Sequence, residues 1–309
     1  MFQGMHYVYE VYKEMSFSKA ARNLFISQPS LSAAVKKAEA QIGFPIFDRS
    51  SNHIQLTELG KEYIRSIEII MDVENGFQNY INDMKELKSG TIAIGGTNLF
   101  ASYVLPPLLS RFTEQYPQVQ VDLVEATTSQ LTDRLFSGSL DLLIDNKNMD
   151  PAVYQKSFFC EEHLLLAVPI RLAVNEKMKN YALTASDIRE NRHLNSRIPP
   201  VPLENFQEES FLLLKSGNDT RTRADRICHN AHVIPKIKLE LDQQITAYNL
   251  SRYGMGISFC SDTLVRHVPD DEGLVYYKLN HQDALREVNF YYKRNRYMPR
   301  IVSTFLDMI

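Results

Sequence analysis

Polar and small side chains recur along residues 28–36 at the spacing of one helix face, and their chemistry suits nucleic acid. Amide and hydroxyl groups hydrogen-bond to base edges in the major groove, and an ammonium group binds phosphate. The side chains expected to contact DNA are Gln28, Ser30, Ser32, Ala33 and Lys36. The alternative is that they form only the solvated face of a helix, so the surrounding elements decide between the two.

Those elements predict two short helices joined by a tight polar turn. Apolar residues at three- and four-residue steps predict a helix over residues 4–14, and Ser16 or Ser18 can cap a second one. Ser27 is a suitable N-cap for a third helix, and Gly43 is a suitable end. The pattern is that of a helix-turn-helix, whose second helix enters the major groove.

A wing follows this helix-turn-helix. Residues 50–53 form a predicted turn, and residues 54–56 alternate like an edge strand. Arg49 and His53 are expected to contact the phosphate backbone there. The whole chain has 34 basic and 37 acidic residues and a net charge of -3, which argues weakly against a nucleic-acid binder. Residues 18–55 carry five basic and two acidic side chains, so this segment alone is positive by three.

A long helix is predicted from residue 57 to about residue 87, where the sequence contains no proline. Apolar residues alternate at four- and three-residue steps, which is the narrow seam of a helix that pairs with another helix. The predicted dimer contacts are Tyr63, Ile67, Ile70, Phe77, Ile81 and Met84. The alternative is a helix that packs on its own domain.

The remaining 220 residues alternate between strand and helix patterns, which predicts a mainly parallel sheet covered on both faces. The 309-residue length favours two or three domains. No apolar run approaches a membrane span, the N-terminus lacks the pattern of a secretion signal, and the three cysteines are scattered. We therefore expect a cytoplasmic protein with reduced thiols, no disulfides and no membrane partner.

The N-terminal sixty residues resemble the signature of LysR-type transcriptional regulators in order and spacing. The matching motifs are Ser16-Phe17-Ser18-Lys19-Ala20-Ala21, Leu24, Ser27-Gln28-Pro29, Ser32, Glu39, Gly43, Phe47-Asp48-Arg49 and Leu56-Thr57-Glu58-Leu59-Gly60. Weaker echoes continue through the chain at Ser89-Gly90, Leu105-Pro106, Asp141-Leu142-Leu143-Ile144 and Gly254-Met255-Gly256-Ile257. Met15, Ala34, Ala38 and Ile42 depart from the usual pattern, and Ala34 puts direct base readout at that position in doubt.

The resemblance implies an all-α winged helix-turn-helix DNA-binding domain over residues 1–60 and a linker helix for dimerisation over residues 61–88. It also implies an α/β effector domain over residues 89–309 with the two-subdomain architecture of periplasmic binding proteins. Subdomain I would comprise residues 89–163 and 266–309, and subdomain II residues 164–265. The implied partners are an operator in double-stranded DNA, a small-molecule effector, further copies of the chain in a homodimer or homotetramer, and RNA polymerase.

The effector is expected to be a small organic acid or a related metabolite bound between the subdomains. Ligands of open α/β folds sit at the carboxyl ends of strands, and helix starts attract anionic oxygens. On the side of subdomain I, the predicted contacts are Thr97, Asn98, Ser102, Thr127 and Thr128. On the side of subdomain II they are Val201, Gln244 and Phe259. For each of these residues, a turn or core role is the alternative.

Two further classes of function are alternatives to an effector-responsive regulator. An enzyme would need a nucleophile with its base, a metal set or a phosphate loop, and the sequence shows none of these at a useful spacing. Cys228, His229 and His232 lie close together, but no second cluster supplies further ligands, so we predict neither a metal nor another cofactor. The other class is a DNA-bending regulator that acts without an effector.

Overall fold

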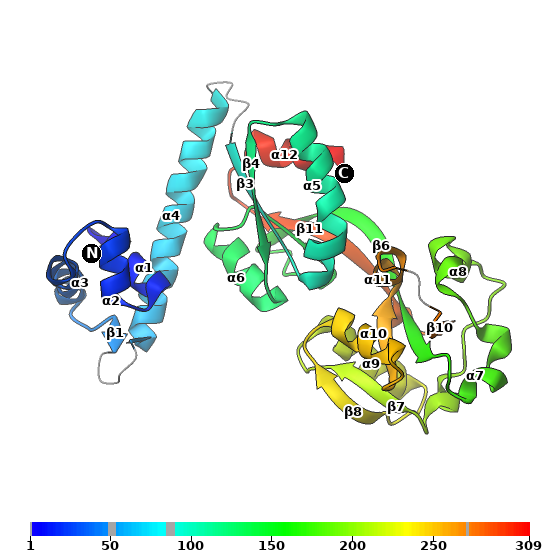
Figure 1. Cartoon of the computed structure of the whole chain (residues 1–309). Helices are drawn as coiled ribbons and strands as arrows, with labels where there is room; N and C mark the ends of the chain where they lie inside the picture. Colours follow the sequence, from blue (N-terminus) through cyan, green and yellow to red (C-terminus); the bar gives the residue numbers. More distant parts are fainter. Residues whose placement is uncertain (1, 49–53, 85–89, 270–271) are drawn as a thin grey trace.

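The computed structural model describes residues 2–48, 54–84, 90–269 and 272–309. These ranges form a small helical head, a long helix and a two-lobed α/β body (Figure 1). The head and the long helix comprise α1 (Met5–Glu14), α2 (Phe17–Asn23), α3 (Gln28–Ile42), β1 (Phe47–Asp48), β2 (Gln55–Leu56) and α4 (Glu58–Met84). The winged helix-turn-helix predicted from the sequence is therefore confirmed. Among the described helices, none combines the length and the apolar composition needed to span a bilayer.

Local signals in the sequence set the ends of the head helices. Ser16 caps α2, because its hydroxyl accepts the N–H of Lys19 at 3.3 Å. Ser27 caps α3 in the same way, and Gly43 ends that helix in the left-handed region at φ 86°. Leu31, Val35 and Ala38 of α3 are buried in the core of the head.

The body contains one nine-stranded sheet that runs through both lobes. Its strand order is β4-β3-β5-β11-β6-β9-β7-β8, and β10 pairs with β6. The strands are β3 (Gly90–Gly96), β4 (Val119–Glu125), β5 (Leu142–Asp145), β6 (Tyr154–Pro169), β7 (Ser210–Leu214), β8 (Lys236–Leu241), β9 (Ile257–Ser261), β10 (Leu274–Lys278) and β11 (Leu285–Lys293). The sheet is mixed: β3, β4 and β5 pair in parallel, as do β7, β8 and β9, whereas β6, β10 and β11 pair antiparallel.

The two lobes are joined by β6 and β11, which run side by side between them (Figure 1). The first half of β6 pairs with β11 and the second half with β9 and β10. Lobe I contains β3, β4 and β5 with the helices α5 (Leu105–Gln115), α6 (Thr128–Ser137) and α12 (Arg300–Met308). Lobe II contains β7 to β10 with α7 (Val174–Lys177), α8 (Ala185–Arg189), α9 (Asp219–Asn230), α10 (Gln244–Arg252) and α11 (Asp262–His267).

The predicted boundary of subdomain II at residue 265 is wrong. Strand β10 pairs with β6 along residues 165–169, so it completes the sheet of lobe II. Helix α11 contacts α8 and β6 in the same lobe. The chain returns to lobe I only with β11, so lobe II extends to about residue 284.

Each lobe has an apolar core on its side of the sheet. In lobe I, Phe112 of α5, Phe290 of β11 and Phe305 of α12 meet edge to face, with ring centroids 5.2 and 5.8 Å apart. In lobe II, Phe206, Phe211 and the strand residues around them form a second cluster. Because each core is closely packed, each lobe is a rigid unit on its side of the joining strands.

Candidate functional site: a DNA-reading helix and an interlobe cleft

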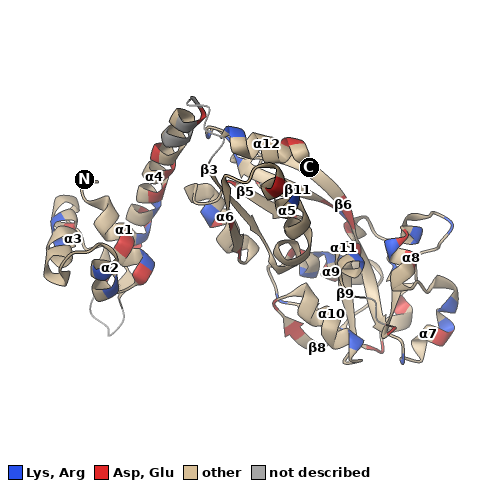
Figure 2. Ribbon diagram, turned by 45° about the horizontal axis from the view of Figure 1, so that its top comes forward, with Lys and Arg blue, Asp and Glu red and all other residues tan. Residues whose placement is uncertain are grey.

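Helix α3 presents its polar face to solvent, as predicted. Gln28, Ser30, Ala33 and Lys36 are exposed, and Ser32 is half-buried. Figure 2 shows basic residues on this helix, which Lys36 and its neighbour at position 37 supply. The hydroxyl of Ser30 also lies 2.7 Å from that of Ser27, so it takes part in the cap. The face can contact a groove, whereas Arg49 and His53 lie outside the described residues.

A glutamate inside α3 fixes the start of the wing. One carboxylate oxygen of Glu39 accepts the backbone N–H groups of Ile46 at 2.9 Å and Phe47 at 3.2 Å. At the start of α4, a Cβ on Gly60 would lie 2.1 Å from the carbonyl oxygen of Ile46, so only glycine allows this approach. Glu39 therefore fixes the start of the wing to the recognition helix, and Gly60 lets α4 approach the same segment closely.

Two of the predicted dimer contacts on α4, Tyr63 and Ile67, are wrong, whereas Ile70 stays a prediction. Tyr63 and Ile67 are buried in the core of the head, where they pack on its other helices. Ile70 is partly buried against the same core. An exposed apolar stripe lies further along α4 and consists of Ile69, Val73, Phe77 and Tyr80. Of the predicted contacts, Phe77 belongs to this stripe, Ile81 is half-buried and the side chain of Met84 lies outside the described residues.

Helix α4 is tied to lobe I by a buried carboxylate. Asp72 is 5% exposed and forms ion pairs with Lys293 and Arg296, each at 2.7 Å. A Cβ on Gly138 would lie 1.8 Å from the Asp72 carboxylate, so the glycine makes room for it. Arg296 also pairs with Asp141 at 2.9 Å. The linker and the C-terminal end of β11 are thus joined by charge and by close packing.

A cleft of about 350 Å³ lies between the lobes, and five of the predicted effector contacts line it. They are Thr97, Asn98, Thr127, Thr128 and Gln244. The volume is suited to a small molecule.

The structure places the other three predicted effector contacts outside the cleft lining. Val201 and Phe259 are each 3% exposed and belong to the apolar core of lobe II, which leaves no surface for a ligand. Ser102 is exposed on the helical turn that precedes α5, outside the cleft lining.

Three helices begin at the cleft. Thr127 caps α6, Asn218 caps α9 and Gln243 precedes α10, and all three line the cavity. The capping oxygens of Thr127 and Asn218 accept backbone N–H groups, whereas the side chain of Gln243 makes no cap hydrogen bond. Helix N-termini carry partial positive charge and unsatisfied N–H groups, so their convergence favours an anion.

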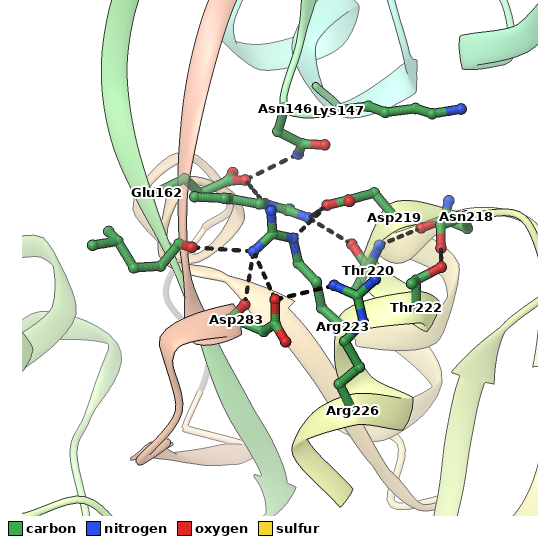
Figure 3. A network of polar contacts seen from close by, with 12 residues as sticks. Asn146, Lys147, Glu162, Asn218, Asp219, Thr220, Thr222, Arg223, Arg226 and Asp283 are labelled. Carbon is green, nitrogen blue, oxygen red and sulfur yellow. Dashed lines mark hydrogen bonds and ion pairs between the residues drawn. The ribbon is translucent and has the colours of Figure 1, made fainter. Parts of the chain in front are cut away.

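A buried ion-pair network forms the floor of the cleft, and it was not predicted from the sequence. Arg286 of β11 is 4% exposed and pairs with Glu162 of β6 at 2.6 Å and with Asp219 of α9 at 3.0 Å. Figure 3 shows Glu162, Asp219 and Thr220 facing this centre, with Asn146 of lobe I hydrogen-bonded to Glu162 at 3.1 Å. Burial alone would lower the pKa of Arg286, but the two carboxylates raise it, so the guanidinium stays charged.

Two further charged residues at the cleft belong to lobe I. Burial raises the pKa of Asp145, although the backbone N–H of Lys147 and the hydroxyl of Thr128 both donate to it at 2.8 Å. The ammonium group of Lys147 is exposed and makes no ion pair within the described part of the chain. It is therefore a cation that a ligand could meet.

The three cysteines lie outside the cleft lining. Cys228 and Cys260 are buried and Cys160 is half-buried. Burial raises the pKa of the Cys160 and Cys228 thiols to about 12 and that of Cys260 further still.

A helix-turn-helix joined by a long helix to a two-lobed body with a cleft defines a class of ligand-responsive DNA-binding proteins. Residues 2–61 match the family model for the bacterial regulatory helix-turn-helix protein, lysR family, and residues 85–309 match the LysR substrate binding domain. The chain belongs to the LysR family of transcriptional regulators, with a DNA-binding helix-turn-helix and an effector-binding domain.

Curated relatives and solved structures match this chain over nearly its whole length. It is 28% identical to the uncharacterized HTH-type transcriptional regulator YcgK of Bacillus subtilis (strain 168), over 98% of this chain and 92% of that one. It is 25% identical to the probable RuBisCO transcriptional regulator of Gracilaria tenuistipitata var. liui, over 96% and 91%. A cysteine-to-aspartate variant of full-length OxyR from Pseudomonas aeruginosa has the same fold, with a TM-score of 0.72 at 21% identity over 100% and 94% of the two chains. Full-length CbnR complexed with its target DNA gives a TM-score of 0.65 at 16% identity over 100% and 98%.

Proposed function

We propose that this regulator binds a small organic acid in the interlobe cleft and that the acid changes how the protein holds its operator. The observation that carries the proposal is the meeting of three helix N-termini at one cavity. A carboxylate placed there accepts N–H groups that have no partner inside their helices. The exposed ammonium of Lys147 adds attraction for the same charge.

The ligand would act by closing the lobes on each other. Thr97 and Thr128 approach it from lobe I, and Gln244 approaches it from lobe II. A ligand that contacts both walls favours the closed arrangement by its differential affinity for that arrangement. Because Asp72 ties α4 to lobe I, a movement of this lobe would be passed to the head.

We infer that the functional unit is a homodimer or homotetramer in the cytoplasm. The apolar stripe formed by Ile69, Val73, Phe77 and Tyr80 is exposed in the single chain, and a second copy would cover it. A dimer would place two recognition helices on a roughly palindromic operator, where RNA polymerase is the expected further partner. The relatives are named as regulators, which supports a role without catalysis.

Calorimetric titration of the purified chain with mono-, di- and aromatic carboxylates tests the ligand. We expect at least one acid to bind, and Thr97→Ala to weaken that binding. Ser102→Ala is the matched control, since Ser102 is a hydroxyl residue of the same segment but lies outside the cleft. Absence of heat with the whole panel, together with an unchanged promoter response of Thr97→Ala, would refute the proposal.

A further inference from the structure

Two histidines and an aspartate meet in lobe II, away from the cleft. They are His163 on β6, His193 in the short helical turn at Arg192–Leu194, and Asp262 at the start of α11. The Nε2 atom of His193 lies 3.0 Å from Oδ2 of Asp262, and Nδ1 of His163 lies 3.7 Å from the same oxygen. The three donor atoms lie within 4.8 Å of one another, and none of the residues lines the cleft.

Backbone hydrogen bonds orient the carboxylate of Asp262 toward the two imidazole rings. Its Oδ1 atom accepts the N–H groups of His163 and Thr263, each at 2.9 Å, so the group is held in one orientation. The other oxygen is left to face both imidazoles. The second nitrogen of His193, Nδ1, is buried with no hydrogen-bond partner among the described residues, so this ring interacts through Nε2.

We propose that His163, His193 and Asp262 bind a divalent transition-metal ion of the Zn²⁺ type. Two imidazole nitrogens and one carboxylate oxygen are a ligand set that zinc accepts, with a fourth position for water. Tetrahedral bonds of about 2.0–2.1 Å place neighbouring ligand atoms about 3.3 Å apart, and the separations of 3.0 and 3.7 Å from Oδ2 of Asp262 lie on either side of this value. The side chain of His163 is 29% exposed, which provides the route of entry, whereas His193 and Asp262 are buried.

Arg266 is the competitor for this position. Its Nη2 atom lies 3.2 Å from Oδ2 of Asp262, four residues away on α11. A guanidinium and a metal ion would compensate the same negative charge, so one displaces the other. Because the side chain of Arg266 is 29% exposed, it can turn into solvent when the metal binds.

The site would reinforce lobe II next to the strands that join the lobes. His163 directly follows Glu162, whose ion pair with Arg286 connects β6 to β11. A metal held by β6, the turn at Arg192–Leu194 and α11 would link three segments that are distant in sequence. A metal that binds only the folded state stabilises that state by an amount that grows with the logarithm of the free metal concentration once this exceeds the Kd.

The test uses the full chain after treatment with a chelator. We expect Zn²⁺ to bind by calorimetry with one ion per chain, and Co²⁺ to give the visible absorption of a tetrahedral site. His193→Gln and the more exposed His163→Gln should each weaken binding at least tenfold, and Arg266→Gln should tighten it. The double variant His229→Gln/His232→Gln removes a histidine pair elsewhere in lobe II and should bind as the parent does.

Three results would overturn the proposal. The first is a chain that takes up neither ion, which would leave the cluster as a polar network neutralised by Arg266. The second is binding that is unchanged in both His163→Gln and His193→Gln. The third is binding that disappears in the His229→Gln/His232→Gln control, which would place the ion at the end of α9 and in the turn that follows it. Thermal unfolding of each variant without metal shows whether a loss of binding reflects a loss of folding.

Discussion

The ion pair between Glu162 and Arg286 offers the sharpest prediction on stability. Glu162 is fully buried, and its Oε2 atom accepts hydrogen bonds from Arg286 at 2.6 Å and from Asn146 at 3.1 Å. The change Glu162→Gln keeps the shape of the side chain and removes its charge. Arg286, at 4% exposure, then faces a neutral amide.

The expected loss follows from what remains around the guanidinium. Removing one partner of a buried ion pair costs about 3–5 kcal/mol, because the other charge stays buried without compensation. Asp219 still contacts Arg286 at 3.0 Å, but it is shared with Arg223 at 2.8 Å, so it compensates only in part. We expect a loss near the lower limit, about 3 kcal/mol. For a body of this size that corresponds to a fall of about 6–12 °C in the melting temperature.

Calorimetric unfolding of the full chain measures this difference, and the same strands supply a control. Lys156 of β6 and Glu287 of β11 also form an ion pair, but both side chains are about half exposed. Lys156→Gln is therefore expected to cost about 0–1 kcal/mol. The double change Glu162→Gln/Arg286→Gln should lose less than the sum of its parts. A melting temperature of Glu162→Gln within about 2 °C of the parent, or equal to that of Lys156→Gln, would refute the expectation.

Three further predictions concern the linker, the thiols and the DNA contacts. Asp72→Asn should lower the free energy of unfolding in urea by about 2–3 kcal/mol. This is less than the loss of a whole buried ion pair, because Arg296 keeps its ion pair with Asp141. An unchanged urea concentration at the midpoint of unfolding would contradict this. Burial raises the pKa of Cys160 and Cys228 to about 12, so at pH 8 about one thiol in ten thousand is ionised. Alkylation of these thiols should therefore be far slower than that of glutathione and should accelerate as the pH rises. Rapid labelling at pH 8 would argue against their burial. Lys36→Ala should reduce the slope of log affinity against log salt by about 0.9 for each phosphate that the lysine neutralises. A slope equal to that of the parent would show that Lys36 contacts no phosphate.

The head was predictable from sequence because its signals are local. A capping serine, a terminal glycine and an apolar stripe act within one or two turns, and Ser27, Gly43 and Leu31 have the roles that their neighbours imply. Tyr63 and Ile67 were misplaced by the same kind of local signal. Periodicity identifies the apolar face of a helix, but it does not say whether the head or a second chain covers that face.

The cleft was predictable on one wall and poorly predictable on the other. Thr97 and Thr128 follow strands of a simple parallel order, so their place at the strand ends could be inferred. Val201 and Phe259 were misplaced, because an apolar side chain beside a strand end packs as readily into the core as into a cavity. Glu162 and Arg286 are 124 positions apart, and only the pairing of β6 with β11 brings them together.

Selection of binding sites from a randomised duplex pool tests the central claim most directly. The full chain is expected to enrich a two-fold repeat whose half-sites are centred about one helical turn, or a multiple of it, apart. Gln28→Ala should change the enriched bases, whereas Gln41→Ala should not, because Gln41 is the same residue type exposed at the far end of α3. A pool without an enriched repeat, or one enriched identically by the parent and by Gln28→Ala, would contradict the assignment of α3 as the helix that reads DNA.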